Sequence, residues 1–108
     1  MGASRLDIHQ QKHLEIAEIA KVFAHPARVA IIEYISKSDA CICTDISEHI
    51  GLSQPTTSQH LKVIRDAGLL QGEFQGKSVC YCLNAEKMEG IKSLFNSFFN
   101  QTKIDCCS

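Results

Sequence analysis

The sequence predicts a small, mainly α-helical domain that contains a single β-hairpin. Over most of the chain, apolar residues recur three or four positions apart, which is the period of a helix. Between residues 70 and 83 the apolar residues instead alternate, and the tip Gln75-Gly76-Lys77 divides this stretch into two strands. Proline and glycine stand at the ends of the helical stretches. A length of 108 residues fits one domain over residues 1–108, with helices on both sides of the hairpin.

The first part of the chain predicts three helices. Pro26 ends the first of them, because a residue that precedes proline is disfavoured in the helical region. A second helix then begins, and a turn leads from it to a short stretch at residues 40–44 that is rich in cysteine and β-branched residues. Thr44 or Asp45 caps the third helix. These helices are expected at residues 5–24, 27–36 and 45–50.

The helix that follows carries the clearest local signals in the chain. Ser53 is a suitable N-cap, and Pro55 lies in the first turn, where a missing N–H costs nothing. Gly68 ends the helix after Ala67, because glycine enters the left-handed region without a Cβ penalty. Two helices around the Gly51-Leu52-Ser53 turn predict a helix-turn-helix over residues 45–67.

The strands after Gly68 are expected at residues 70–74 and 78–83, so that residues 70–83 form a wing beside the helix-turn-helix. Asn84 caps a last helix at 85–100, whose apolar face has little chain left to cover it. Residues 101–108 are expected to be a loose tail that contains two cysteines.

Composition excludes several classes of protein. The formal net charge is −1, so any contact with nucleic acid must come from a local patch. The polar N-terminus shows no signal peptide, and no apolar run approaches the ~20 residues of a membrane span, which favours a cytoplasmic protein with no membrane partner. No set of nucleophile, base and orienting residue is visible, and no phosphate loop, so an enzyme is not expected.

One side of the helix after Ser53 is polar and carries no carboxylate between Gln54 and Lys62. Short, mixed donors and acceptors suit base edges, and lysine or arginine suits phosphates. The alternative is an ordinary solvated face, and for Thr57 and His60 a structural role. The residues that we expect to contact DNA are Ser53, Gln54, Thr56, Thr57, Ser58, Gln59, His60, Lys62, Arg65 and Lys77.

Six cysteines in 108 residues form three close pairs: Cys41/Cys43, Cys80/Cys82 and Cys106/Cys107. Thiols stay reduced in the cytoplasm, so metal, metalloid or redox chemistry is favoured over a disulfide framework. In a strand, two residues at i and i+2 share a face, so the first pair can hold one soft ion, and a tail thiolate can complete a three-thiolate set. The alternatives are buried, inert thiols and a four-thiol cluster in which strands pair Cys80 and Cys82 with the first two.

The stretches FAHPARVAIIEYI, DISEHIGLSQPTTSQHLKVIRDAGLL and GKSVCYCLN resemble the ArsR/SmtB family of metal- and metalloid-responsive repressors, over roughly residues 15–84. The resemblance implies a winged helix-turn-helix homodimer, joined through residues 1–24 and 85–100, that binds a palindromic double-stranded operator and is released by an inducer. Metal-binding members carry C-V-C-D-L where this chain reads C-I-C-T-D-I, so its cysteines stand one residue earlier.

The first hypothesis is therefore a dimeric repressor released by a thiophilic ion, with no obligatory cofactor. As(III) or Sb(III) is favoured as the inducer, and Cd(II), Pb(II) and Zn(II) also accept thiolates. The expected ligands are Cys41, Cys43, Cys106 and Cys107, with Cys80 and Cys82 as the alternative. A second hypothesis is a repressor of the same fold whose thiols sense redox or reactive sulfur species, and a third is a protein-interaction module with structural zinc.

Overall fold

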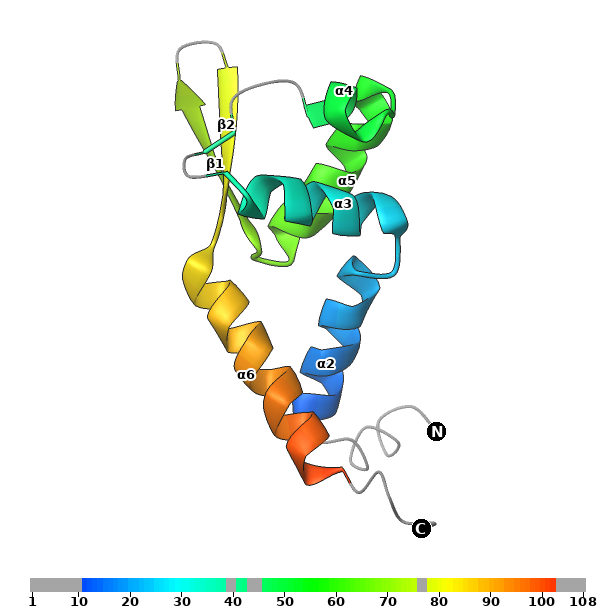
Figure 1. Ribbon diagram of the computed structural model, residues 1–108, viewed down its shortest axis with the longest axis vertical. Coiled ribbons are helices and arrows are strands. Elements are labelled where there is room, and N and C mark those ends of the chain that lie inside the picture. The colour runs from blue at the N-terminus through cyan, green and yellow to red at the C-terminus, as the bar shows by residue number, and fades with distance from the viewer. Residues whose placement is uncertain (1–10, 39–40, 43–45, 76–77, 103–108) are drawn as a thin grey trace.

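The structure is a computed structural model, and it describes residues 11–38, 41–42, 46–75 and 78–102. Helices and strands follow one another in the order that the sequence predicts (Figure 1). They are α2 (Gln11–Val22), α3 (Pro26–Ser36), α4 (Ile46–Ile50), α5 (Gln54–Asp66), β1 (Leu70–Gln75), β2 (Ser78–Leu83) and α6 (Ala85–Gln101). The predicted mainly helical fold with one antiparallel hairpin is confirmed.

Local chemistry fixes the helix starts where the sequence predicts them. His25 is extended, at φ −116° and ψ 127°, and Pro26 begins α3 directly after it. The Ser53 side chain accepts a hydrogen bond from the Thr56 backbone N–H at 3.3 Å, and Asn84 Oδ1 accepts one from the Lys87 N–H at 3.1 Å. Each cap satisfies a backbone donor that the first turn of a helix leaves without a partner.

Two glycines set the connections on either side of α5. Gly51 and Gly68 have φ values of 80° and 89°, in the left-handed region where a Cβ is unfavourable. Gly51 ends α4 with an N–H bond to the Ser47 carbonyl oxygen at 2.9 Å, and Gly68 ends α5 with one to Arg65 at 2.8 Å. Both turns change the direction of the chain sharply, so the orientation of α5 on the core depends on them.

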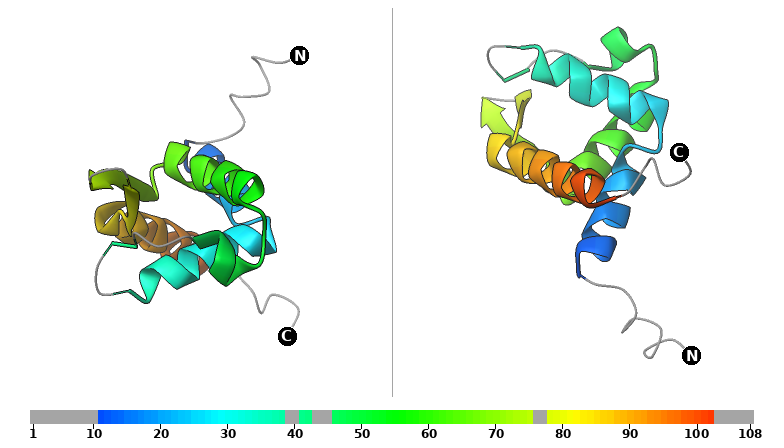
Figure 2. Two further views of the ribbon diagram at one scale, coloured as in Figure 1. Left: turned by 90° about the horizontal axis from the view of Figure 1, so that it is seen from above. Right: turned by 60° about the horizontal axis from the view of Figure 1, so that its bottom comes forward.

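The core lies where α3 and α5 meet the hairpin. Ile31, Ile64 and Leu69 are fully buried there, and Leu70 at the start of β1 is 4% exposed. Helices α3, α4 and α5 and the hairpin form one body, while α2 and α6 extend from it as two arms that converge at their far ends (Figures 1 and 2), where Lys12 Nζ donates to Gln101 Oε1 at 3.0 Å. The helix-turn-helix is thus held by the core at one end of the molecule, and the two arms form the other end.

The arms bury little. No residue of α6 is buried, although the helix carries apolar residues along its length, and α2 buries only Ile19 and Val22. None of the described helices combines the length and apolar character needed to cross a membrane.

Candidate nucleic-acid interface and thiol pair

Helix α5 has two distinct sides. Thr57, Leu61 and Ile64 are buried, and their spacing of four and then three residues places them on one face against the core. The opposite side is exposed to solvent, and it carries most of the residues predicted to contact DNA. Its exposed members are Gln54, Thr56, Ser58, Gln59, Lys62 and Arg65.

Of the two roles that the sequence left open for Thr57, a DNA contact and a structural position, its burial favours the structural one. Its residue is 3% exposed, so a hydroxyl there does not reach a DNA groove while α5 stays packed on the core. The Thr57 Oγ1 atom is buried and has no hydrogen-bond partner among the residues that the structure describes. A partnerless buried hydroxyl costs free energy, so this position is structural and suboptimal rather than part of the polar row.

His60 is half-buried and is held by residues from another helix. Its Nδ1 accepts a hydrogen bond from Arg28 Nε at 3.3 Å, and its ring centroid lies 5.6 Å from that of His25. Burial lowers the pKa of His60 below its usual value, and the nearby Arg28 and His25 lower it further. His60 is therefore neutral near pH 7 and ties the middle of α5 to the start of α3.

The other residues predicted to contact DNA differ in the interactions that they make within the chain. Ser53 is occupied as the N-cap and also donates from Oγ to Thr56 Oγ1 at 3.0 Å. Lys62 Nζ lies 2.9 Å from Asp66 Oδ2, but both side chains are mostly exposed, so water screens the pair and the ammonium stays accessible. Arg65 is exposed one turn further along. Lys77 lies outside the described residues.

The wing strand β2 pairs on both of its edges. On one edge it runs antiparallel to β1, with Leu70 opposite Leu83 and Gln71 opposite Cys82. On the other edge Ile42, from the stretch before α4, forms an isolated antiparallel bridge with Tyr81. Ile42 and Tyr81 exchange both of their backbone N–H···O bonds at 2.8 Å. This bridge links the Cys41–Ile42 segment, which precedes the helix-turn-helix in the sequence, to the wing.

The bridge brings two cysteines into contact. Cys41 and Cys82 are joined as a disulfide, with their Cα atoms 4.5 Å apart. In an antiparallel ladder, the positions that flank a hydrogen-bonded pair such as Ile42–Tyr81 are non-hydrogen-bonded pairs, whose Cα atoms approach to about 4.5 Å. The cross-strand pairing that the sequence left as the alternative is therefore present for Cys41 and Cys82.

The other cysteines are distributed unevenly. Cys80 is fully buried and is also disulfide-bonded. Cys43, Cys106 and Cys107, which the sequence placed in the metal set with Cys41, lie outside the described residues. Within the described ranges, no three His, Cys, Asp or Glu side chains gather closely enough to hold a metal ion.

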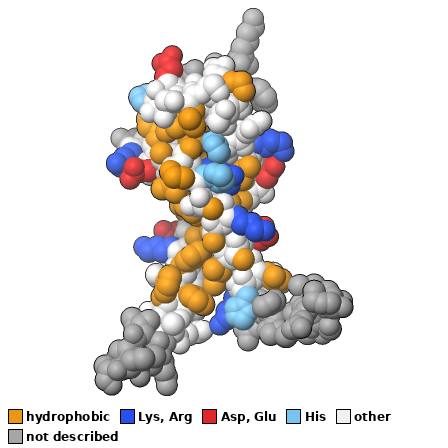
Figure 3. All heavy atoms as spheres, turned by 90° about the vertical axis from the view of Figure 1, so that its right-hand side faces the viewer, with side chains coloured by type: hydrophobic (Ala, Val, Ile, Leu, Met, Phe, Trp, Pro, Cys, Tyr) orange, Lys and Arg blue, Asp and Glu red, His pale blue; other side chains and the backbone are white. Residues whose placement is uncertain are grey.

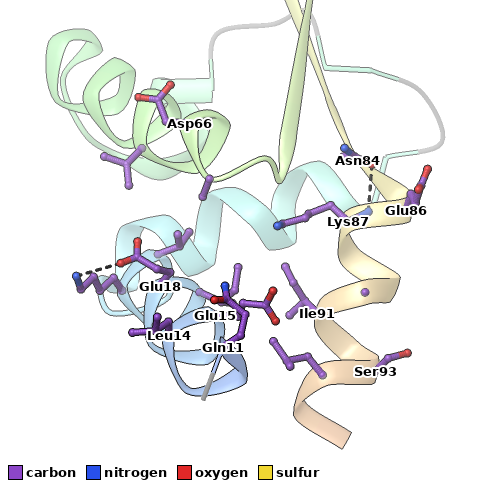
Figure 4. Close-up of a pocket in the computed structure, with 17 residues that line it drawn as sticks. Gln11, Leu14, Glu15, Glu18, Asp66, Asn84, Glu86, Lys87, Ile91 and Ser93 are labelled. Atoms are coloured by element: carbon purple, nitrogen blue, oxygen red, sulfur yellow. Dashed lines mark hydrogen bonds and ion pairs between the residues drawn. The ribbon is translucent and has the colours of Figure 1, made fainter. Parts of the chain in front are cut away.

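A cavity of about 1230 Å³ separates the two arms, below the end of α5. Glu15 of α2 and Ile91 of α6 extend toward the space between the helices (Figure 4). Apolar side chains remain at the surface nearby, and Leu14 and Phe99 are 42% and 60% exposed. The space-filling view shows hydrophobic side chains over much of this side of the molecule, including its lower half (Figure 3).

Sequence reasoning missed Arg28, His25 and Tyr81. No local signal links Arg28 to His60, because the two lie 32 residues apart and meet only through tertiary packing. Tyr81 stands between Cys80 and Cys82 and lines a small hollow of about 200 Å³ together with α5 residues. Strand alternation could have indicated that its side chain points away from the two cysteines.

Comparison with known proteins gives a consistent result. A family model described as "Bacterial regulatory protein, arsR family" matches residues 25–71, which span α3 through the start of β1. The arsenical resistance operon repressor of Staphylococcus xylosus is 36% identical over 77 residues, which cover 71% of this chain and 73% of that protein. The transcriptional repressor PagR of Bacillus anthracis is 39% identical over 80 residues, covering 74% and 80%.

Solved structures agree with these relatives. A crystal structure of a possible transcriptional regulator for arsenical resistance superposes with a TM-score of 0.63 at 26% identity, covering 73% of this chain and 81% of that one. The repressor BigR from Xylella fastidiosa has a TM-score of 0.62 at 24% identity, covering 91% and 97%, and shows a likeness of fold.

Proposed function

We propose a function from the premise that this chain belongs to the ArsR/SmtB family of bacterial transcriptional repressors. The proposal is that it binds double-stranded operator DNA as a homodimer and that a thiophilic inducer releases it. The family consists of DNA-binding repressors, which are not enzymes. The observation that carries the proposal is the two-sided α5, whose buried face fixes it on the core and whose exposed face carries the polar row.

The DNA contacts follow from that row. Gln54, Thr56, Ser58 and Gln59 occupy the N-terminal half of α5, and they are the proposed base readers. Lys62 and Arg65 follow toward the C-terminal end and are proposed to hold phosphates, which supply affinity and salt dependence. Lys77 at the wing tip is proposed to contact the backbone or the minor groove.

A second copy of the chain is the proposed occupant of the apolar surface on the arms. Helix α6 buries none of its residues, and its apolar side chains Ile91, Phe95 and Phe98 are only half-buried. Large exposed apolar areas mark protein–protein contacts, and a domain of this size gains from burying more surface. A homodimer would also present two copies of α5 to a palindromic operator.

Thiolates are the proposed inducer ligands. As(III) and Sb(III) favour soft thiolate donors, and Cd(II), Pb(II) and Zn(II) also accept them. Cys41 and Cys82 bring two sulfur atoms together just before the helix-turn-helix, so the donor chemistry of the described residues fits a thiophilic ion. Cys43, Cys106 and Cys107, which the sequence predicts as ligands together with Cys41, are the alternative partners to Cys82. A metalloid inducer is supported by the similarity of this chain to an arsenical resistance operon repressor.

The second candidate keeps the same repressor but makes its thiols redox or reactive-sulfur sensors. The observation that favours it is the Cys41–Cys82 disulfide. A hydroperoxide, for example, would oxidise one thiol to a sulfenic acid and be reduced to the alcohol, or to water for hydrogen peroxide. The second thiol would then attack the sulfenic sulfur, so that the disulfide forms and one water leaves.

An electrophoretic shift assay tests the proposal. Duplexes selected from a random pool by the reduced protein serve as the operator, and each complex is then exposed to As(III), Cd(II), Zn(II) or a hydroperoxide. We expect a salt-dependent complex that As(III) releases. Release by the hydroperoxide alone would support the redox candidate. Tightly bound zinc in the purified protein, with no salt-dependent DNA affinity, would instead indicate a protein-interaction module and refute the proposal.

A further inference from the structure

We infer that the inducer site is a cross-strand dithiol formed by Cys41 and Cys82, which binds one trivalent arsenical or antimonial between the Cys41–Ile42 segment and the wing strand β2. The inference rests on the proposed function and names the ligand pair at its thiol site. It differs from the sequence-based set, in which Cys41 acts with Cys43 and the tail.

The backbone geometry preorganises the pair. The bridge between Ile42 and Tyr81 is closed by two hydrogen bonds of 2.8 Å, which fixes the register on both sides of it. Cys41 and Cys82 then form the narrow, non-hydrogen-bonded pair, with a Cα separation of 4.5 Å.

The pair is also accessible to a small ligand. Cys41 and Cys82 are each half-buried, whereas Cys80 on the same face of β2 is fully buried. A small hydroxide of arsenic or antimony can therefore reach the two half-buried sulfur atoms once they are reduced. Reaching Cys80 would require the sheet to open.

The binding step balances without any oxidant. Arsenous acid, As(OH)₃, condenses with two thiols, so that two As–O bonds and two S–H bonds break while two As–S bonds form and two waters leave. Arsenic stays trivalent and retains one hydroxide. The step requires both cysteines as thiols, so a thiol reductant must first reduce the Cys41–Cys82 disulfide by thiol–disulfide exchange, in which two reductant thiols become one disulfide.

Tyr81 connects this pair to the DNA-binding helix. Successive side chains alternate across a strand, so Tyr81 points to the face opposite Cys80 and Cys82. On that face it lines the hollow of about 200 Å³ with Ser58, Lys62 and Arg65 of α5, as well as Leu61. An ion that bridges Cys41 and Cys82 holds the Cys41–Ile42 segment and β2 together, and so constrains Tyr81 against α5. The inducer lowers DNA affinity to the extent that it binds more tightly to the arrangement of β2 and α5 that DNA binds less tightly.

Phenylarsine oxide is the discriminating probe, because it bonds to only two thiols. Its affinity for the reduced full-length protein is measured by calorimetry for wild type, Cys41→Ser, Cys82→Ser and Cys43→Ser, with a Cys106→Ser/Cys107→Ser variant as the matched control. We expect one probe per chain, with affinity at least about tenfold weaker in Cys41→Ser and in Cys82→Ser and unchanged in the other two. Wild-type affinity in Cys82→Ser, with loss in Cys43→Ser or in the tail variant, would overturn the inference.

Thiol footprinting on the wild-type chain removes any dependence on how the variants fold. Bound phenylarsine oxide is expected to protect Cys41 and Cys82 from alkylation and to leave Cys106 and Cys107 reactive, whereas protection of a tail cysteine together with Cys41 would refute the pair. Neither measurement involves DNA. Protection of Cys41 and Cys82 with no release of operator would therefore support this site and refute the inducer part of the proposed function.

Discussion

Two adjacent threonines on α5 provide a matched test of how this helix is oriented. Thr56 is exposed, whereas Thr57 is 3% exposed and its Oγ1 atom lacks a hydrogen-bond partner within the described part of the chain. Replacing either by valine exchanges one hydroxyl for one methyl group and keeps a β-branched side chain, so helix propensity changes little. The two variants therefore differ mainly in which side of the helix loses its hydroxyl.

The magnitudes follow from burial. A buried polar group without a partner costs about 1–3 kcal/mol, so Thr57→Val is expected to raise the free energy of unfolding by about 1 kcal/mol or more. For a domain of this size, 1 kcal/mol corresponds to about 4–8 °C in Tm. Thr56→Val removes an exposed group that accepts a bond from Ser53, and loss of one hydrogen bond to DNA, worth about 1 kcal/mol, weakens operator binding by about fivefold.

The assays are urea unfolding at one fixed protein concentration, since a dimer's stability depends on concentration, and operator titration by fluorescence anisotropy at one salt concentration. Thr57→Val should be more stable than wild type and bind the operator equally well, while Thr56→Val should bind more weakly at nearly unchanged stability. The reasoning fails if Thr57→Val is destabilised, or if it weakens DNA binding as much as Thr56→Val does.

Three further predictions concern charge, pH and backbone conformation. Arg65→Gln removes one proposed phosphate contact, so the slope of log K against log salt should become shallower by about 1, and an unchanged slope would exclude that contact. Burial, and then Arg28 and His25, lower the pKa of His60, so the unfolded chain binds a proton at His60 more tightly than the folded chain does. The contribution of His60 to the free energy of unfolding is therefore present above pH 6.5 and is lost as the pH falls below that value. An NMR titration should give His60 a pKa below 6.5 that rises in Arg28→Gln, and a pKa at or above 6.5 in wild type would contradict the contact. Gly68→Ala places a Cβ at φ 89° and should cost about 1–2 kcal/mol by urea unfolding, whereas an unchanged free energy would show that the turn adapts.

The fold could be predicted from the sequence because its signals are local. Ser53, Asn84 and Pro26 fix helix starts, Gly51 and Gly68 fix the turns, and alternation marks the two strands, all within a few residues of the features that they set. The buried phase of α5 was also readable, since Thr57 lies four residues before Leu61 on the same face. The expectation of a DNA contact at Thr57 followed its polarity instead of that spacing.

Long-range contacts at the site could not be predicted in the same way. The Cys41–Cys82 pair depends on the register of the Ile42–Tyr81 bridge, and a shift of one residue would place the cysteines on opposite faces. The contact between Arg28 and His60 joins α3 to α5 and has no counterpart in local sequence. Both arise from how the elements pack.

The most direct test of a thiol-controlled repressor is one titration of the reduced protein–operator complex with arsenite at constant salt. Fluorescence anisotropy follows the bound DNA, and alkylation of samples taken along the titration counts the thiols that arsenite has occupied. The account predicts that operator affinity falls at least about tenfold and that DNA release parallels the protection of Cys41 and Cys82 from alkylation. It also predicts that an excess of a small dithiol restores the complex. Full operator affinity with both cysteines occupied by arsenic would contradict it.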